Sequence, residues 1–189
     1  MKAIVWLMGL ICLACSTTTY NKGVVNLVQV DACVWRSGQE TTNEQWQTIK
    51  SLGTTSIAKL NFENEGSDDG ARQLGIDVHD FSIEPRGDLD FVIDSILHTL
   101  IHPDRTVVAA ADAYIATFYP VPFDGGFACP SGILLIHCTH GQDRTGYFIG
   151  RYRVLSYHWT KQQAFDEMIA NGFHTSLHGI YDEWSDWQP

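Results

Sequence analysis

The order of apolar runs and helical patterns in this 189-residue chain predicts an α/β fold with a central, mainly parallel sheet flanked by helices. Short apolar or β-branched runs alternate with helical segments through the first two thirds of the chain. One of these runs, residues 132–136, has the composition of a strand buried on both faces, and the final third is helical in pattern. Strands joined through helices lie parallel in one sheet.

Strands are expected where short apolar or β-branched runs end at turn residues. These runs are residues 24–30, 32–38, 55–62, 75–83 and 132–136. The last of them leads directly into His137 and Cys138. Residues 119–132 contain prolines and glycines and are expected to form a surface loop.

Helices are expected at residues 41–53, 67–75, 84–100, 104–118, 145–159, 160–172 and 176–184. The first is the best defined, because Thr42 is placed as a cap, Trp46 and Ile49 share one face, and Gly53 ends the pattern. Three tryptophans are expected to pack the terminal helices together; they are Trp159, Trp184 and Trp187.

Length and composition predict a single domain over residues 23–189, because a chain with 44% hydrophobic residues can bury one sizeable core. The net charge of −10 argues against nucleic acid or an anionic membrane surface as the main partner. An anionic small molecule remains compatible with this charge, since local donors outweigh a distant field that salt screens beyond about 10 Å.

Residues 1–22 resemble an export signal, because Lys2 precedes an apolar run from Ala3 to Ala14 that is too short to span a bilayer. Ala14 followed by Cys15 resembles a bacterial lipobox, in which the cysteine carries a lipid anchor, although Cys12 stands where leucine is usual. We therefore expect an exported protein of the periplasm or outer membrane, with an uncleaved N-terminal anchor as the alternative.

Three cysteines follow the leader, and export would place them in an oxidising compartment. Cys33 and Cys129 could then form a disulfide while Cys138 stays free. Two buried thiols at positions 33 and 129 are the favoured interpretation.

The segment His-Cys-Thr-His-Gly-Gln-Asp-Arg-Thr-Gly, residues 137–146, predicts an anion site. A loop between a strand and a helix directs several backbone N–H groups one way, and the helix dipole adds partial positive charge there. Gly141 permits a tight turn, and Arg144 can bind two oxygens of a phosphate at once. These groups also favour the thiolate of Cys138, which we expect to act as a nucleophile.

The neighbouring residues are expected to bind substrate or support the nucleophile. Thr145 can donate its hydroxyl to the sulfur, and His137 is expected to orient the loop through a hydrogen bond. The predicted substrate-binding residues are Thr139, His140, Gly141, Gln142, Asp143, Thr145 and His137.

Other interpretations of this loop are weaker. A nucleotide-binding loop would end in Gly-Lys-Ser or Gly-Lys-Thr. A metal site at His137, Cys138 and His140 lacks a fourth ligand at the usual spacing, and the single pair His174 and His178 is thin support for another. An unreactive buried thiol is the plain alternative. We expect neither a metal nor a cofactor.

His-Cys-x5-Arg-Thr-Gly is the signature of the cysteine-dependent protein tyrosine phosphatase superfamily, and this chain resembles it at every defining position. Residues 34–61 and 150–174 are also similar to bacterial dual-specificity members. The resemblance implies the phosphotyrosine protein phosphatase-like fold and a hydrolase that works through a phosphocysteine intermediate, with Cys138 and Arg144 as catalytic residues.

Within that superfamily the chain resembles the exported tyrosine-phosphatase-like phytases, which implies inositol phosphates, including inositol hexakisphosphate, as substrates. Local positive charge is expected from His140, Arg86, Lys59 and Arg36, whereas Asp143 suits a highly charged ligand poorly. The alternatives are a tyrosine or dual-specificity protein phosphatase, a rhodanese-like sulfurtransferase, and a non-catalytic phosphate-binding module.

The resemblance also implies a general acid, an aspartate on a loop after the preceding strand. Asp88 is favoured, because it directly follows the strand expected at residues 75–83. Asp104 lies at a more usual distance upstream of the cysteine, but its position suits a helix cap. Asp90 and Glu84 are the remaining candidates.

Overall fold

The computed structural model describes residues 23–85 and 103–189, and these build a five-stranded sheet in the order β1-β2-β7-β3-β4. The strands are β1 (Val28–Gln29), β2 (Val34–Ser37), β3 (Thr54–Lys59), β4 (Asp77–Asp80) and β7 (Ile133–His137). β1 pairs with β2 in antiparallel fashion, and all other neighbours in this sheet are parallel. The predicted fold class is confirmed. Residues 1–22 and most of the helix expected at 84–100 lie outside the described ranges.

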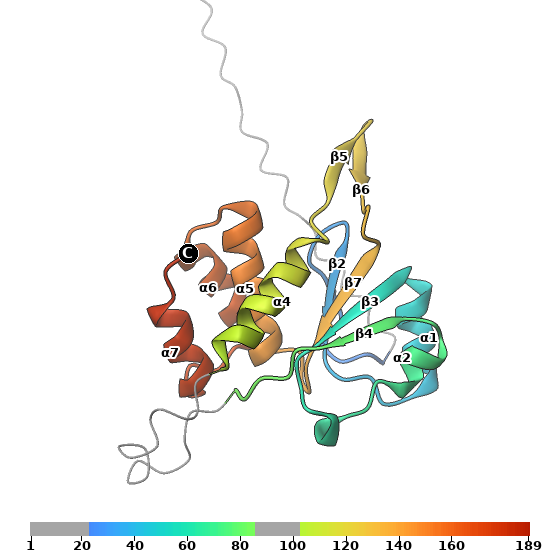
Figure 1. The fold of residues 1–189 in the computed structure, drawn as a ribbon, viewed down its shortest axis with the longest axis horizontal. Helices are drawn as coiled ribbons and strands as arrows, with labels where there is room; N and C mark the ends of the chain where they lie inside the picture. Colours follow the sequence, from blue (N-terminus) through green and yellow to red (C-terminus); the bar gives the residue numbers. More distant parts are fainter. Residues whose placement is uncertain (1–22, 86–102) are drawn as a thin grey trace, which may run out of the picture.

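Helices cover both faces of the sheet (Figure 1). One face carries α1 (Asn43–Ser51) and α2 (Asp69–Gln73); the other carries α4 (Arg105–Ala116), α5 (Asp143–Tyr157), α6 (Lys161–Ala170) and α7 (His178–Asp186). Within the described ranges, no helix combines the length and the apolar character that crossing a membrane requires.

Successive side chains of the central strands point to opposite faces of the sheet, so the hydrophobic core consists of two clusters. Ile57 and Leu135 pack beneath α1 and α2, whereas Ala58 and Ile136, one residue further along each strand, belong to the larger cluster under the other four helices. All four of these side chains are fully buried, which is the arrangement predicted for the apolar run at 132–136.

Helix α1 follows its sequence signals closely. The side chain of Thr42 accepts a hydrogen bond from the backbone N–H of Gln45, and the side chain of Gln45 accepts one from the backbone N–H of Thr42. Such caps contribute about 1 kcal/mol each. Trp46 and Ile49 are buried, and Gly53 adopts a φ of +85° after the helix ends. The predicted cap, face and end are therefore confirmed.

The expectation of a loop over residues 119–132 is wrong, because this segment contains a hairpin. Strands β5 (Val121–Phe123) and β6 (Gly126–Ala128) pair in antiparallel fashion and project from the body of the molecule (Figure 1). The two residues between them, Asp124 and Gly125, are a favoured hairpin turn, and Gly125 has a φ of +84°. The surrounding prolines and glycines favour an irregular loop, and the sequence therefore did not indicate the two short strands.

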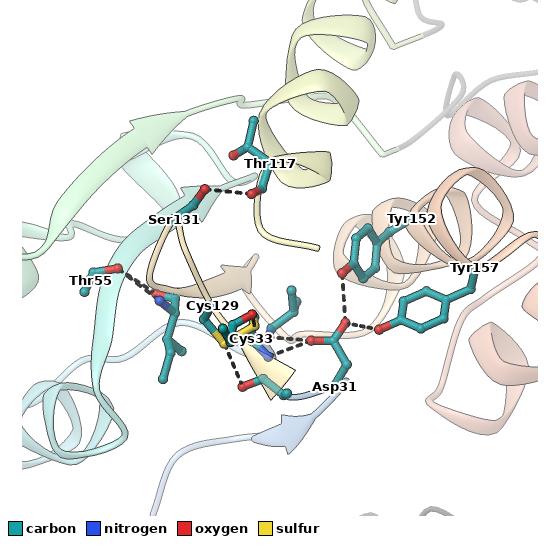
Figure 2. The surroundings of a disulfide bond; sticks show 12 residues. Asp31, Cys33, Thr55, Thr117, Cys129, Ser131, Tyr152 and Tyr157 are labelled. Carbon is teal, nitrogen blue, oxygen red and sulfur yellow. Dashed lines mark hydrogen bonds between the residues drawn. A yellow bond between two sulfur atoms is a disulfide. The ribbon is translucent and has the colours of Figure 1, made fainter. Parts of the chain in front are cut away.

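The favoured interpretation of Cys33 and Cys129 as buried thiols is also wrong, because they form a disulfide with an S–S distance of 1.99 Å (Figure 2). Cys33 directly precedes β2, and Cys129 lies shortly before β7. These strands are parallel neighbours that start at the same edge of the sheet, so the preceding residues meet there. A cross-link between residues 96 positions apart stabilises a fold by about 2–4 kcal/mol.

Asp31 ties this edge of the sheet to helix α5 (Figure 2). One carboxylate oxygen accepts from the backbone N–H groups of Cys33 and Val34, at 2.7 and 2.9 Å. The other accepts from the hydroxyls of Tyr152 and Tyr157, each at 2.9 Å. The disulfide and this carboxylate together fix the start of β2, which lies at the opposite end of the strand from the loop that contains Cys138.

The terminal helices pack around tryptophans, as predicted. Trp184 is 3% exposed and lies 5.5 Å from Trp187 between ring centres. Arginines of α5 cover the other rings, with Arg151 4.1 Å from the ring centre of Trp187 and Arg153 4.8 Å from that of Trp159. These contacts hold the helical third of the chain against α5.

Candidate active site

The loop from Cys138 to Gln142 connects the end of β7 to the start of α5, at the edge of the sheet where its parallel strands end. It borders a cavity of about 450 Å³. The cavity is lined by Glu65, Glu84, Pro85, Cys138, Thr139, His140, Gln142, Asp143, Arg144, His174, Ser176 and Leu177. The predicted catalytic residues Cys138 and Arg144 line it. Of the predicted substrate-binding residues, four line it, and the other three, Gly141, His137 and Thr145, are not among the lining residues; the four are Thr139, His140, Gln142 and Asp143.

Three consecutive carbonyl groups of the loop, at positions 139, 140 and 141, are bound by the surrounding scaffold. Their donors are the backbone N–H of Gln39 at 3.1 Å, the side-chain amide of Asn26 at 2.7 Å and the guanidinium of Arg36 at 2.6 Å. A peptide's N–H points away from its C=O. With the carbonyls held against the scaffold, the N–H groups can face the cavity, as an anion cradle requires.

Gly141 is required by both conformation and space. Its φ is +70°, a region that side chains rarely adopt. A Cβ at this position would collide with the backbone of Ser37 and Gly38 at the end of β2. The loop can therefore pass this close to β2 only with glycine at position 141.

The hydroxyl of Thr145 donates a hydrogen bond to the sulfur of Cys138 at 3.1 Å. Thr145 is fully buried, and Cys138 is 3% exposed and lines the cavity. A hydroxyl donor stabilises negative charge on sulfur more than it stabilises a neutral thiol. This arrangement suits a thiolate nucleophile that must later leave a covalent intermediate.

Arg144 is held by an acidic residue that sequence reasoning missed. Its guanidinium donates to both carboxylate oxygens of Glu65, at 2.7 and 2.8 Å, and to the hydroxyl of Thr139 at 2.8 Å. Glu65 belongs to the short helix η1 (Glu63–Glu65) after β3. The hydrogen bonds from Arg144 lower the pKa of Glu65 to about 2. Glu65 is therefore ionised at neutral pH and orients Arg144, and it cannot supply a proton to a leaving group.

Two of the expected sources of positive charge do not reach the cavity. Arg36 is 2% exposed and binds the loop from beneath, and Lys59 is fully buried against Glu63 and the carbonyl oxygen of Gly66. The expectation that they supply charge to a substrate is therefore wrong, because Arg36 is bound to the backbone of the loop and Lys59 is held by the segment that follows β3. His140 does line the cavity, and Arg86 lies outside the described residues.

The general-acid candidates occupy different places. Asp104 caps α4, accepting from the backbone N–H of Thr106 at 2.8 Å, and hydrogen bonds from the side chain and backbone of Thr106 lower the pKa of Asp104. It does not line the cavity, whereas Glu84 does. Asp88 and Asp90 lie outside the described residues.

The two histidines considered as metal ligands have other surroundings. The carboxylate of Asp143 accepts from the backbone N–H of His174 at 2.7 Å and lies 3.0 Å from its Nδ1, which ties the segment after α6 to the loop. His178 lies 3.9 Å from Asp182 on its own helix. Among the residues that the structure describes, no three metal-ligating side chains form a cluster.

No family model matches the chain. A segment of 42 residues is 48% identical to the dual specificity protein phosphatase TpbA of Pseudomonas aeruginosa; it covers 22% of this chain and 19% of that protein, so the match spans about a fifth of the curated relative.

Solved structures match over most of the chain. The crystal structure of TpbA from P. aeruginosa is 22% identical with a TM-score of 0.55, over 87% of this chain and 86% of that one. The core catalytic domain of the PP-IP phosphatase Siw14 from S. cerevisiae is 19% identical with a TM-score of 0.58, over 86% and 85%. PTPMT1 in complex with PI(5)P is 12% identical with a TM-score of 0.55, over 84% and 94%.

These neighbours are cysteine-dependent phosphatases of the protein tyrosine phosphatase type. The three matches each cover more than four fifths of the chain. The chain therefore has the protein tyrosine phosphatase-like fold and carries the complete His-Cys-x5-Arg-Thr-Gly signature of the cysteine-dependent phosphatases at the end of β7 and the start of α5.

Proposed function

We propose that this protein is a phosphomonoesterase that works through a phosphocysteine intermediate. The observation that supports this most directly is the sulfur of Cys138, with the Thr145 hydroxyl 3.1 Å away, beside a loop whose carbonyls are bound on the far side. Preorganised donors of this kind stabilise the charge that develops on a transferred phosphoryl group.

The reaction has two steps. In the first, the thiolate of Cys138 bonds to phosphorus while the bond to the leaving oxygen breaks, and a general acid gives that oxygen a proton. In the second, water attacks the phosphocysteine, the P–S bond breaks, and the proton of the water returns to the same acid. Inorganic phosphate leaves and the thiolate is restored, with Thr145 stabilising the departing sulfur.

Inositol phosphates, including inositol hexakisphosphate, are the proposed substrates. Two structural neighbours are described as a PP-IP phosphatase and as a complex with PI(5)P, which supports a ligand of this class. The cavity also imposes a limit, because three carboxylates line it, those of Glu65, Glu84 and Asp143. We therefore expect inositol phosphates with fewer phosphates to be hydrolysed faster than the hexakisphosphate.

A tyrosine or dual-specificity protein phosphatase is the second candidate. The 42-residue match to the dual specificity protein phosphatase TpbA favours it. The cavity is compatible with an aromatic leaving group, since Pro85 and Leu177 contribute apolar surface to its wall.

A substrate panel separates these candidates. We expect purified protein to hydrolyse inositol phosphates faster than phosphotyrosine peptides at matched concentrations, with the rates unchanged by a chelator of divalent metals. Initial rates of phosphate release measure both. Faster release from the peptides would favour the second candidate, and sulfur transfer from thiosulfate to cyanide would instead identify a sulfurtransferase.

We also propose that the protein is exported and held at the cell envelope by lipid at Cys15. The disulfide between Cys33 and Cys129 supports export, because such bonds persist in oxidising compartments. Replacing Cys15 with alanine is expected to move the protein from the membrane fraction to the soluble fraction or to block its processing, as measured by fractionation and intact mass. An unchanged distribution and mass would leave secretion without lipid or an uncleaved anchor.

A further inference from the structure

A buried histidine and a buried carboxylate are in contact next to the residue proposed as the nucleophile. The Nε2 atom of His137 is 2.8 Å from a carboxylate oxygen of Asp68, and both side chains are fully buried. His137 is the last residue of β7 and precedes Cys138, whereas Asp68 directly precedes α2. The two are 69 residues apart in sequence.

The carboxylate of Asp68 is fixed from its other side as well. Its second oxygen accepts a hydrogen bond from the side-chain amide of Gln39 at 2.9 Å and lies 4.0 Å from the ammonium of Lys59. Burial alone would raise the pKa of Asp68, but the hydrogen bonds from His137 and Gln39 and the charges of His137 and Lys59 hold it below its usual value. Asp68 is thus a rigid, ionised partner for the imidazole.

Besides Asp68, three residues interact with His137: Glu40, Trp46 and Cys138. Glu40, buried after β2, has a pKa raised to about 7 by burial, and its charged form attracts the imidazole. The Trp46 ring lies edge-on at 6.3 Å between ring centres. Burial favours a neutral His137, but the hydrogen bond and charge of Asp68, with smaller contributions from Glu40 and Cys138, raise its pKa above the usual value.

We propose that Asp68 is a positioning residue that keeps His137 protonated beside Cys138 and thereby favours the thiolate form of the nucleophile. The proposal rests on the proposed role of Cys138, but it concerns the thiol itself and can be measured without a substrate. If Asp68 loses its charge, burial leaves the imidazole neutral, and the sulfur loses a neighbouring positive charge.

The test is the pH dependence of Cys138 alkylation by iodoacetamide, followed by peptide mass spectrometry. Asp68→Asn should move the midpoint of the rate profile up by about one pH unit, because opposite charges nearby shift ionisation by about 1–3 units. Below the midpoint this means alkylation about 10-fold slower. Well above the midpoint, the two proteins should react at equal rates, since the thiol is then fully ionised in both.

A matched control is Asp69→Asn. Asp69 is adjacent in sequence and equally charged, but its side chain is 74% exposed and pairs with Arg72. This variant should leave the alkylation midpoint unchanged. A folded Asp68→Asn protein with the midpoint of the unsubstituted protein would overturn the proposal, because a merely structural carboxylate does not move this profile.

A second measurement needs no substitution. Nitrogen NMR of the unsubstituted protein should show both ring nitrogens of His137 protonated at pH 7.5, where an ordinary histidine with a pKa of about 6.5 is mostly neutral. A neutral ring at that pH would refute the proposal. If the protein hydrolyses no phosphate ester while the alkylation midpoint still moves, the proposed function fails and the role of Asp68 stands.

Discussion

Replacing Cys138 with serine is expected to lower the rate of phosphate-ester hydrolysis by about 10³-fold or more, because the covalent route closes. A serine hydroxyl stays protonated at neutral pH, and Thr145 alone offers it no base. Phosphate binding should persist, since the hydrogen bonds that hold the loop, from Gln39, Asn26 and Arg36, end on backbone carbonyl oxygens that the substitution leaves in place. Steady-state rates and calorimetric titration with inorganic phosphate measure the two effects separately.

Acid quenching of the unsubstituted protein during turnover provides the matching positive result. A phosphoryl group should be found on the peptide that contains Cys138, and it should be missing from the serine variant. A serine variant that retained substantial activity would show that the covalent mechanism is wrong.

The parts of the molecule that the sequence predicted are those whose signals are local. The cap at Thr42, the apolar run before His137 and the residues of the loop itself each depend on neighbours within a few positions. The hairpin turn at Asp124 and Gly125 also has a local signal, because these two residue types favour a two-residue turn, although the sequence analysis predicts a loop there.

The supports of the site could not be predicted in this way, because they depend on the order of strands in the sheet. Arg144 meets Glu65 across 79 residues, and His137 meets Asp68 across 69, only because β3 lies beside β7. The disulfide similarly depends on the common starting edge of β2 and β7. Nothing near Arg144 or His137 in the sequence indicates its partner, and the count of cysteines made the disulfide only one of two open alternatives.

Arg36 illustrates a second limit. Its charge is evident from the sequence, but its direction is set by the register of β2, where it lies opposite Ile136 and binds the carbonyl oxygen of Gly141. A residue that looks available to an anionic substrate therefore acts on the backbone of the loop. The sequence gives the charge of a side chain directly, but the group that the side chain contacts depends on strand register and on the tertiary fold.

The general acid is expected on the segment that follows β4, and Asp88 is our proposal for it. Glu84 and Pro85, the last described residues of that segment, line the cavity, and Asp88 follows them closely in sequence. Asp88→Asn is expected to lower the hydrolysis of a substrate with a poor, alkoxide-like leaving group by about 10²-fold or more. The same change should matter far less for an aryl phosphate whose leaving group needs no proton.

Asp104 and Glu84 supply the matched comparisons. Asp104 caps α4 and does not line the cavity. Asp104→Asn should therefore change thermal stability little, because asparagine also caps helices well, and it should leave the dependence on the leaving group intact. Rates for the two substrates, together with thermal unfolding, distinguish these effects. If Glu84→Gln alone produced the leaving-group-dependent loss, the acid would be Glu84. If Asp104→Asn produced it while Asp88→Asn behaved like the unsubstituted protein, the roles of the two aspartates would have to be exchanged.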